Sequence, residues 1–168
     1  MPEYLMTGAA NYQPLRDSLQ AQNWKTSDRE TRRIMLQIAQ RLRMSQNLPP
    51  SEAEWLVNLD YLTEEDGKQF PLSDLCILDN LWTHYSGGQF GFSIQAQIWQ
   101  EFQRDYALFA DAVGWSMGEM DWRTYSELLF DITAPEGHLP AAPFYTKTGL
   151  GVGWVASLSL RLKECQEQ

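Results

Sequence analysis

Apolar residues recur every three or four positions along most of the chain, which is the spacing of one face of a helix. Ile34, Met35, Ile38 and Leu42 show this spacing in one stretch. Period-two alternation, which indicates strands with one buried face, is scarce. The pattern therefore predicts an all-α fold with short helices and long structured loops. The expected helices span residues 11–22, 27–44, 51–59, 71–85, 93–109 and 155–164.

Polar residues and helix breakers indicate where these helices begin and end. The stretches Ser27–Glu30 and Ser51–Glu54 each match a capping box, in which the first and last side chains satisfy free backbone N–H groups. The acidic run 64–67 is expected to form a turn. Gly87 and Gly88 are expected to end a helix in a tight turn with positive φ, which glycine adopts without a steric penalty.

The length and composition fit one globular domain over residues 1–168. A chain of 168 residues can bury a core without a metal or a disulfide. Hydrophobic residues make up 43% of it and charged residues 21%, which is typical of a folded protein. Cys76 and Cys165 lie far apart and outside any metal-binding spacing. They are expected to be small buried or surface residues in a reducing compartment, not a disulfide.

The net charge of −9 excludes some classes of partner. Nonspecific binding to nucleic acid needs cations that neutralise phosphates, and adhesion to an anionic membrane needs them as well. No apolar run approaches the length of a membrane span, so no integral membrane association is expected. Residues 1–10 lack the basic start and long apolar stretch of a signal peptide. The expected location is the cytoplasm, or the plastid stroma for a product whose transit segment has been removed.

Aromatic side chains are frequent in the segments expected to be loops, and the chain has seven tryptophans. Such rings on a concave surface suit a flat apolar ligand, although for any single ring a place in the core is favoured. The candidate ligand-contacting residues of this kind are Phe90, Phe92, Trp115, Trp122, Leu128 and Phe130.

The two histidines, His84 and His138, offer the other candidate chemistry. Either imidazole can ligate a metal or transfer a proton. His138 lies between Gly137 and Pro140, where hydrogen bonds from the ring to the backbone are favoured as a way to hold a rigid loop. No nucleophile elbow, CxxC pair or HExxH motif is present. We therefore predict no catalytic or metal-binding residue, and a binding protein instead of an enzyme.

Two ordered motifs connect the chain with a known family. The first comprises residues 70–75 (FPLSDL) and 85–95 (YSGGQFGFSIQ), and the second comprises residues 134–140 (APEGHLP). Together with the pattern of leucine, tryptophan, aspartate, threonine and methionine over 15–35, they resemble the signatures of the Genomes Uncoupled Four family. The likeness covers about residues 12–140, and the family core is expected at about 11–165.

The resemblance implies an all-helical fold shaped like a cupped hand. The palm of that fold binds protoporphyrin IX and magnesium protoporphyrin IX, and in some members a bilin, with no further cofactor required. Such proteins are porphyrin-binding regulators that activate magnesium chelatase in chlorophyll biosynthesis, through the large porphyrin-binding subunit of that enzyme. His138 and Leu139 of the second motif join the expected ligand-binding residues.

The chain departs from the family pattern after the second motif. Chelatase-activating members carry an asparagine and two arginines there at three-residue steps, and the same offsets give Pro143, Thr146 and Gly149 in this chain. Lys147 is the only cation of this loop in the sequence, so it is the expected partner of the ligand's carboxylates.

Two further hypotheses stay open. In the first, the chain is a paralogous interaction or signalling module on the same scaffold, with altered (bilin) or lost tetrapyrrole binding. Its candidate docking surface is the basic face of the second helix, although a solvated face is the favoured interpretation. In the second, which ranks last, the chain is a haem or redox protein that uses His84 or His138. The basic face comprises Arg29, Arg32, Arg33, Arg41 and Arg43.

Overall fold

The computed structural model describes residues 10–119, 121–146, 149–150 and 153–166. These residues form eight α-helices and one pair of very short strands, which confirms the expected all-α fold. No helix in the described ranges is both long and apolar enough to span a bilayer. The helices are α1 (Gln13–Gln20), α2 (Trp24–Met44), α3 (Pro50–Val57), α4 (Glu64–Gln69), α5 (Leu72–Tyr85), α6 (Phe92–Glu101), α7 (Tyr106–Ala112) and α8 (Gly153–Gln166). The smaller elements are the 3-10 helices η2 (Tyr125–Glu127) and η3 (Ala142–Phe144) and the antiparallel strands β1 (Tyr145–Thr146) and β2 (Gly149–Leu150).

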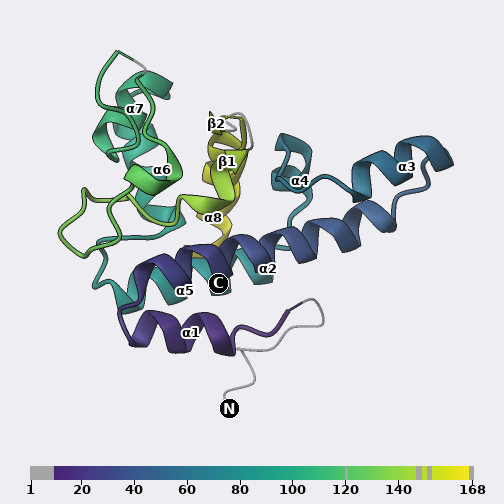
Figure 1. Cartoon of the computed structure of the whole chain (residues 1–168), viewed down its shortest axis with the longest axis horizontal. Coiled ribbons are helices and arrows are strands. Elements are labelled where there is room, and N and C mark those ends of the chain that lie inside the picture. The colour runs from purple at the N-terminus through teal and green to yellow at the C-terminus, as the bar shows by residue number, and fades with distance from the viewer. Residues whose placement is uncertain (1–9, 120, 147–148, 151–152, 167–168) are drawn as a thin grey trace.

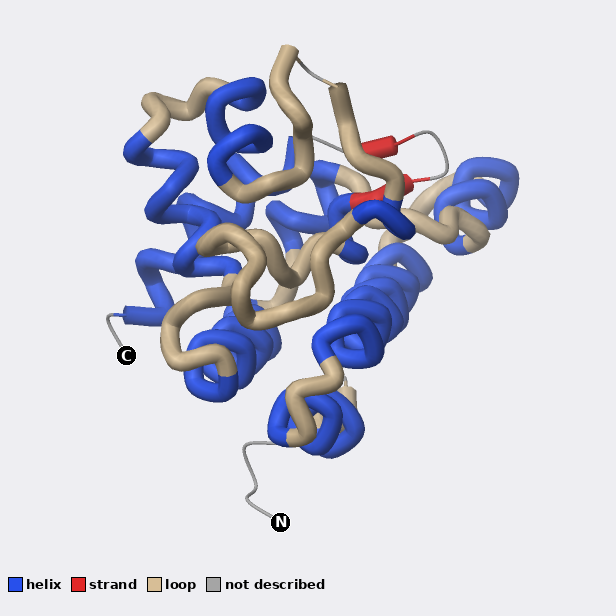
Figure 2. The backbone as a smooth tube through the Cα atoms, turned by 60° about the vertical axis from the view of Figure 1, so that its left-hand side comes forward, coloured by secondary structure: helices blue, strands red, loops and turns tan. Residues whose placement is uncertain are grey.

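The long helix α2 is the axis of the fold. α1 packs along it, and α5 runs beside both (Figure 1). α6 and α7 rise at one end of this layer and α3 and α4 at the other, with the β1–β2 pair and α8 between them (Figure 1). The long connection from α7 to β1, which is mostly loop in Figure 2, lies against the first half of α2. Two raised ends on a common layer match the expected cupped-hand shape.

The core forms where α2 meets α5. Along α2 the helical spacing found in the sequence places Ile34, Met35 and Ile38 at 1% exposure or less. At its start, Trp24 stacks on Trp82 of α5 with ring centroids 6.2 Å apart. The indole Nε1–H of Trp82 donates to Thr31 at 2.9 Å, so the one polar atom of that ring is satisfied inside the core.

Two expected helix starts and one expected turn are wrong. α2 begins at Trp24, before Ser27, since the Trp24 ring packs into the core and Asn23 supplies the N-cap. α3 has Pro49 at its N-cap and no side-chain cap from Ser51. The acidic run 64–67 begins α4 instead of forming a turn. Its capping box comes from Thr63 and Asp66, with acidic residues in the first turn where the helix dipole favours them.

One further expected helix proved to be two. The stretch 93–109 divides into α6, which begins at Phe92 after Gly91, and α7, which Asp105 caps. Gln103 and Arg104 between them have positive φ values of 54° and 63°, which no helix continues through.

The tight turn expected at the paired glycines, Gly87 and Gly88, is confirmed, because both have positive φ.

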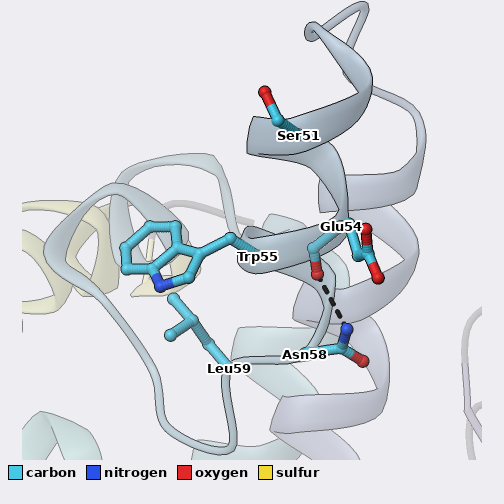
Figure 3. A pocket seen from close by; sticks show the side chains of 5 residues that line it. All are labelled: Ser51, Glu54, Trp55, Asn58 and Leu59. Carbon is cyan, nitrogen blue, oxygen red and sulfur yellow. Dashed lines mark hydrogen bonds between the residues drawn. The ribbon is translucent and has the colours of Figure 1, made fainter.

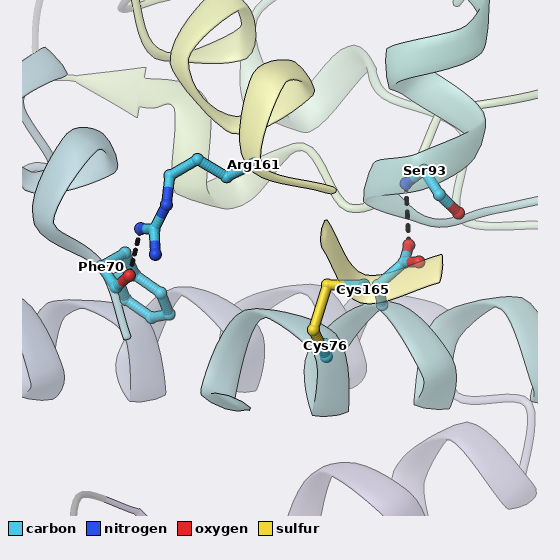
Figure 4. The surroundings of a disulfide bond; sticks show 6 residues. Phe70, Cys76, Ser93, Arg161 and Cys165 are labelled. Carbon is cyan, nitrogen blue, oxygen red and sulfur yellow. Dashed lines mark hydrogen bonds between the residues drawn. A yellow bond between two sulfur atoms is a disulfide. The ribbon is translucent and has the colours of Figure 1, made fainter. Parts of the chain in front are cut away.

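Cys76 and Cys165 form a disulfide, so the expectation of unpaired cysteines is wrong. Their Cα atoms lie 5.5 Å apart although 89 residues separate them in sequence. Only the packing of α8 against α5 brings them together (Figure 4). Sequence spacing alone contains no signal for a contact of that kind.

Candidate functional site

His138 holds the loop that follows α7. Its ring is fully buried, with Nδ1 2.6 Å from the carbonyl oxygen of Val113 and Nε2 2.9 Å from the backbone nitrogen of Leu129. Because the Leu129 N–H donates, Nε2 accepts, and Nδ1–H therefore donates to Val113. Burial lowers the pKa of His138, which favours this neutral form. The expected backbone-bonding role of His138 is confirmed, and both ring nitrogens are used in it.

Asp28 on α2 joins two parts of the loop region to the helix. Its buried carboxylate accepts the backbone N–H of Ala141 at 2.7 Å and that of Ala142 at 3.0 Å. It also accepts the hydroxyl of Tyr125 at 2.7 Å. Burial raises the pKa of Asp28 to about 6, although these hydrogen bonds act in the opposite direction. One side chain thus fixes η2 and η3 relative to α2.

Arg32 lies one turn further along α2 and holds the same region through carbonyl groups. Its guanidinium donates to the carbonyl of Ala142 at 2.8 Å and to that of Tyr145. It also donates to the carbonyl of Asp60, in the connection between α3 and α4, at 2.6 Å. The start of β1 is therefore tied both to α2 and to the far raised end of the fold.

The loops held in this way present a group of aromatic rings. Tyr125 contacts Phe130 with ring centroids 5.4 Å apart and Tyr145 with centroids 5.6 Å apart. Tyr125 and Phe130 are half-buried, and Tyr145 is 9% exposed. We call Tyr125, Phe130 and Tyr145 the aromatic platform. Lys25 of α2 places its ammonium 5.5 Å from the centre of the Phe130 ring, within the range of a cation–π contact.

Three cations surround the aromatic platform. Lys25 and Arg29 are exposed and lie four residues apart, so they project from the same side of α2. Burial raises the pKa of the Tyr125 hydroxyl, and Arg29 hydrogen-bonds that hydroxyl and opposes the rise. Arg123 is half-buried, and its Nε has no hydrogen-bond partner. The region therefore combines half-buried aromatic rings with cationic groups, and such a combination can hold a flat ligand with an anionic edge.

The structure separates the expected ligand-binding residues by their burial. Trp122 and Phe130 are half-buried, and Phe130 belongs to the aromatic platform. Lys147 lies outside the described residues. The other six are in the core at 5% exposure or less: Phe90, Phe92, Trp115, Leu128, His138 and Leu139. Because these six side chains are buried, they do not form the surface that a ligand would contact in this structure.

Reasoning from the sequence missed Tyr125 and Tyr145 of the aromatic platform and two of the cations around it, Lys25 and Arg123, and it placed Arg29 only in a candidate docking surface. One usable signal was present, since Lys25, Asp28, Arg29 and Arg32 follow the i, i+3, i+4, i+7 spacing of one helix face. No local pattern indicated Tyr145, because its position depends on contacts between distant segments.

The basic face of α2 is not one continuous docking surface. Arg32 is used by the loops, and Arg33 pairs with Glu30 at 2.5 Å within the helix. Arg43 is 1% exposed, and its guanidinium forms a salt bridge with the carboxylate of Asp66. A solvated face was the favoured interpretation, and at Arg43 it is wrong, because α4 and the loop before it cover that end of the helix.

Two hollows lie elsewhere on the described part of the surface. One, of about 360 Å³, follows α3, where the 65%-exposed indole of Trp55 lies over Leu59 (Figure 3). The other, of about 450 Å³, follows α5 and includes His84. Neither contains an arginine or a lysine among its lining residues. The first is lined by Ser51, Glu54, Trp55, Asn58 and Leu59, and the second by Ile77, Asn80, Leu81, His84 and Tyr85.

Metal chemistry has no ready site in the described ranges, because no three His, Cys, Asp or Glu side chains there form a group that could hold an ion. Comparison with known proteins identifies the scaffold. Residues 6–156 match the model of the GUN4-like family. The chain belongs to this family.

Individual relatives agree with that assignment. The chain is 32% identical over 130 residues to the Ycf53-like protein of a Synechocystis species, which is 77% of this chain and 50% of that protein. It is 29% identical over 141 residues to the tetrapyrrole-binding protein, chloroplastic, of Arabidopsis thaliana, covering 79% and 48% of the two chains. The chain thus spans about half the length of the curated relatives it matches.

The fold comparison gives the same family. The solved structure of GUN4 from Chlamydomonas reinhardtii superposes with a TM-score of 0.69 at 26% identity, covering 92% of this chain and 90% of that one. The ligand-free structure of Arabidopsis thaliana GUN4 superposes with a TM-score of 0.67, also at 26% identity, over 92% and 94% of the two chains.

Proposed function

We propose that this protein is a tetrapyrrole-binding regulator, and that it binds protoporphyrin IX or magnesium protoporphyrin IX against the aromatic platform. Membership of the GUN4-like family supports the ligand class, because one relative carries the name tetrapyrrole-binding protein. The contact that carries the placement is the Lys25 ammonium above the Phe130 ring, with Arg29 one turn away. A macrocycle over these rings brings its carboxylates to the cations.

The energetics are adequate for a regulatory ligand. Covering roughly 300 Å² of apolar macrocycle at about 25 cal/mol per Å² contributes about 7.5 kcal/mol. Ordering costs reduce this figure, and charge-assisted contacts to the carboxylates offset part of the reduction. The expected dissociation constant is on the order of micromolar to tens of micromolar.

In this chain the cations of α2 bind the ligand's carboxylates, a role that the family pattern gives to arginines of a later loop. At the first of the three expected offsets the chain has Pro143, which is buried in η3 and carries no charge. Lys25 and Arg29 lie on a rigid helix beside the same loop region. We therefore assign carboxylate binding to Lys25, Arg29 and Arg123, with Lys147 as a further contributor.

The partner that follows from this ligand is magnesium chelatase. The protein presents a porphyrin to the large porphyrin-binding subunit of that enzyme and so activates chelation in chlorophyll biosynthesis, acting as a regulator and not as a catalyst. The place of action is an aqueous compartment, either the cytoplasm or the plastid stroma.

A fluorescence titration tests the proposal. Magnesium protoporphyrin IX is added to the full chain, and tryptophan emission is followed, since the half-buried Trp122 is three residues from Tyr125 of the platform in sequence. We expect saturable quenching with a dissociation constant in the stated range. Lack of quenching at about a hundred micromolar would contradict the proposal.

A linear bilin titrated in parallel distinguishes the second candidate. The loss of the later asparagine and arginines favours a changed ligand, because those groups position a closed macrocycle in the family pattern. Tighter binding of the bilin than of the porphyrin would favour a paralogous signalling module on this scaffold.

A further inference from the structure

The disulfide lies at the end of the C-terminal helix. Cys165 is in the last turn of α8, whereas Cys76 is in the first half of α5 (Figure 4). Cys76 is buried at 9% exposure, and Cys165 is half-buried. Cys165 is therefore the more exposed of the two residues, and it belongs to the end of the helix.

The rest of α8 is held without the disulfide. Its inner face packs Val155, Leu158 and Leu162 at 3% exposure or less. Upstream of Cys165, Arg161 donates to the carbonyl of Phe70, which anchors the helix to the segment between α4 and α5 (Figure 4). The part of α8 before Cys165 is therefore held by contacts that do not involve the disulfide.

A terminal turn is also the part of a helix that opens most readily. Helix ends fray, and local opening costs far less there than in a packed centre. An incoming thiolate has to approach a disulfide sulfur directly, so a frayed turn exposes Cys165 without unfolding the core. A structural disulfide in the middle of two packed helices lacks this access.

We propose that the Cys76–Cys165 bond is a site of reversible thiol–disulfide exchange with a dithiol protein of the thioredoxin class, and that reduction releases the last turn of α8 from α5. The reductant's thiolate forms a bond to Sγ of Cys165, the Sγ–Sγ bond breaks, and Cys76 leaves as a thiolate that takes up a proton. The reductant's second thiol then attacks the mixed disulfide. This step forms the reductant's own disulfide and frees Cys165 as a thiol.

Two electrons and two protons pass from the dithiol to the chain in one cycle, and an oxidised dithiol protein reverses it. The site is independent of the proposed tetrapyrrole ligand, because it involves neither the aromatic platform nor its cations. Its experiment uses no porphyrin, so the two proposals fail separately.

The experiment uses the full oxidised chain under native conditions with thioredoxin, thioredoxin reductase and NADPH. We expect one NADPH oxidised per chain and two new thiols, measured by absorbance and by alkylation with mass spectrometry. A thioredoxin variant that lacks its second cysteine should form a mixed disulfide with Cys165. A chain that consumes NADPH only after denaturation, or a mixed disulfide at Cys76, overturns the proposal.

Two controls keep the outcome specific. The matched variants Cys76→Ser and Cys165→Ser should consume no NADPH. On the reduced wild-type chain, hydrogen exchange should accelerate about tenfold or more in the last turn of α8 and stay unchanged in α2. Acceleration throughout the chain would show that the bond supports the whole fold, and would contradict a local release.

Discussion

Each half of α2 carries one fully buried charged side chain, a carboxylate in the first half and a guanidinium in the second. In the first half, the Asp28 carboxylate accepts backbone N–H groups from the loop region. In the second half, the Arg43 guanidinium donates to the carboxylate of Asp66 and to the carbonyls of Leu59 and Tyr61. Both side chains are buried at 1% exposure or less. The first half therefore places a buried carboxylate, together with the half-buried Arg32, against the loop region, whereas the second half places a buried guanidinium against the α3–α4 connection.

The difference separates the end of α2 whose buried charge is paired with an opposite charge from the end that has exposed cations beside its buried charge. Arg43 is paired with Asp66 and completes a closed set of hydrogen bonds around the α3–α4 connection. Asp28 instead accepts hydrogen bonds from the Tyr125 hydroxyl and from backbone N–H groups, with the charge of the half-buried Arg32 nearby. Beside it on α2, Lys25 and Arg29 are exposed. We expect ligand binding at the first half and pure stabilisation at the second.

The largest expected effect comes from breaking the second half. Arg43→Met removes the guanidinium and leaves the Asp66 carboxylate buried without its partner, which typically costs about 3–5 kcal/mol. Urea denaturation followed by circular dichroism measures the change. The control is Arg33→Met, whose pair with Glu30 is on the surface and is worth less than about 1 kcal/mol. Equal losses in the two variants would remove the distinction between the two halves.

A smaller effect on the free energy of unfolding is expected from Asp28. Its sign is opposite to that of ordinary acid denaturation, because this contribution to stability is greatest at low pH. Its folded pKa of about 6 lies above the ordinary value of 3.8, so the folded state holds the proton more tightly between these values. Stability contributed by Asp28 is therefore complete below about pH 4 and is lost as the pH rises through 6, by about 3 kcal/mol at most.

The matched variant isolates this contribution from other titrating groups. His138 acts in the opposite direction. Its pKa is lowered in the folded state, so acidification favours the unfolded state and reduces the free energy of unfolding. Unfolding free energies of wild type and Asp28→Asn are compared between pH 4 and 7, and their difference should change with pH in the stated sense. A difference that stays constant with pH contradicts the buried, titrating role of Asp28.

Much of the fold was predictable from periodicity, and the parts that were not depend on distant contacts. The spacing of Ile34, Met35 and Ile38 predicted α2, and the apolar face of residues 71–85 predicted α5. The start of α2 was misplaced because Trp24 packs on Trp82, a contact that no local pattern contains. The disulfide was missed for the same reason, since only the docking of α8 brings its two halves together.

The candidate site was predictable only in kind. The loop aromatics indicated a surface for a flat ligand, yet most of the chosen rings are core residues here, because a ring beside a loop packs inward when the loop closes over it. The role of His138 was predictable because a buried imidazole between Gly137 and Pro140 needs backbone partners. Lys25 and Arg29 were predictable from the helical spacing of α2, but only once the loops were known to lie against that helix, whereas Arg123 lies in the loop connection itself.

The most direct test of the central claim is the affinity of the double variant Lys25→Ala/Arg29→Ala for magnesium protoporphyrin IX. We predict binding weaker by about tenfold, roughly 1.4 kcal/mol, because the ligand's carboxylates lose two cations. The control Lys68→Ala, which removes an exposed lysine on α4, should bind as wild type does. A folded double variant with unchanged affinity would contradict the placement of the ligand on the aromatic platform.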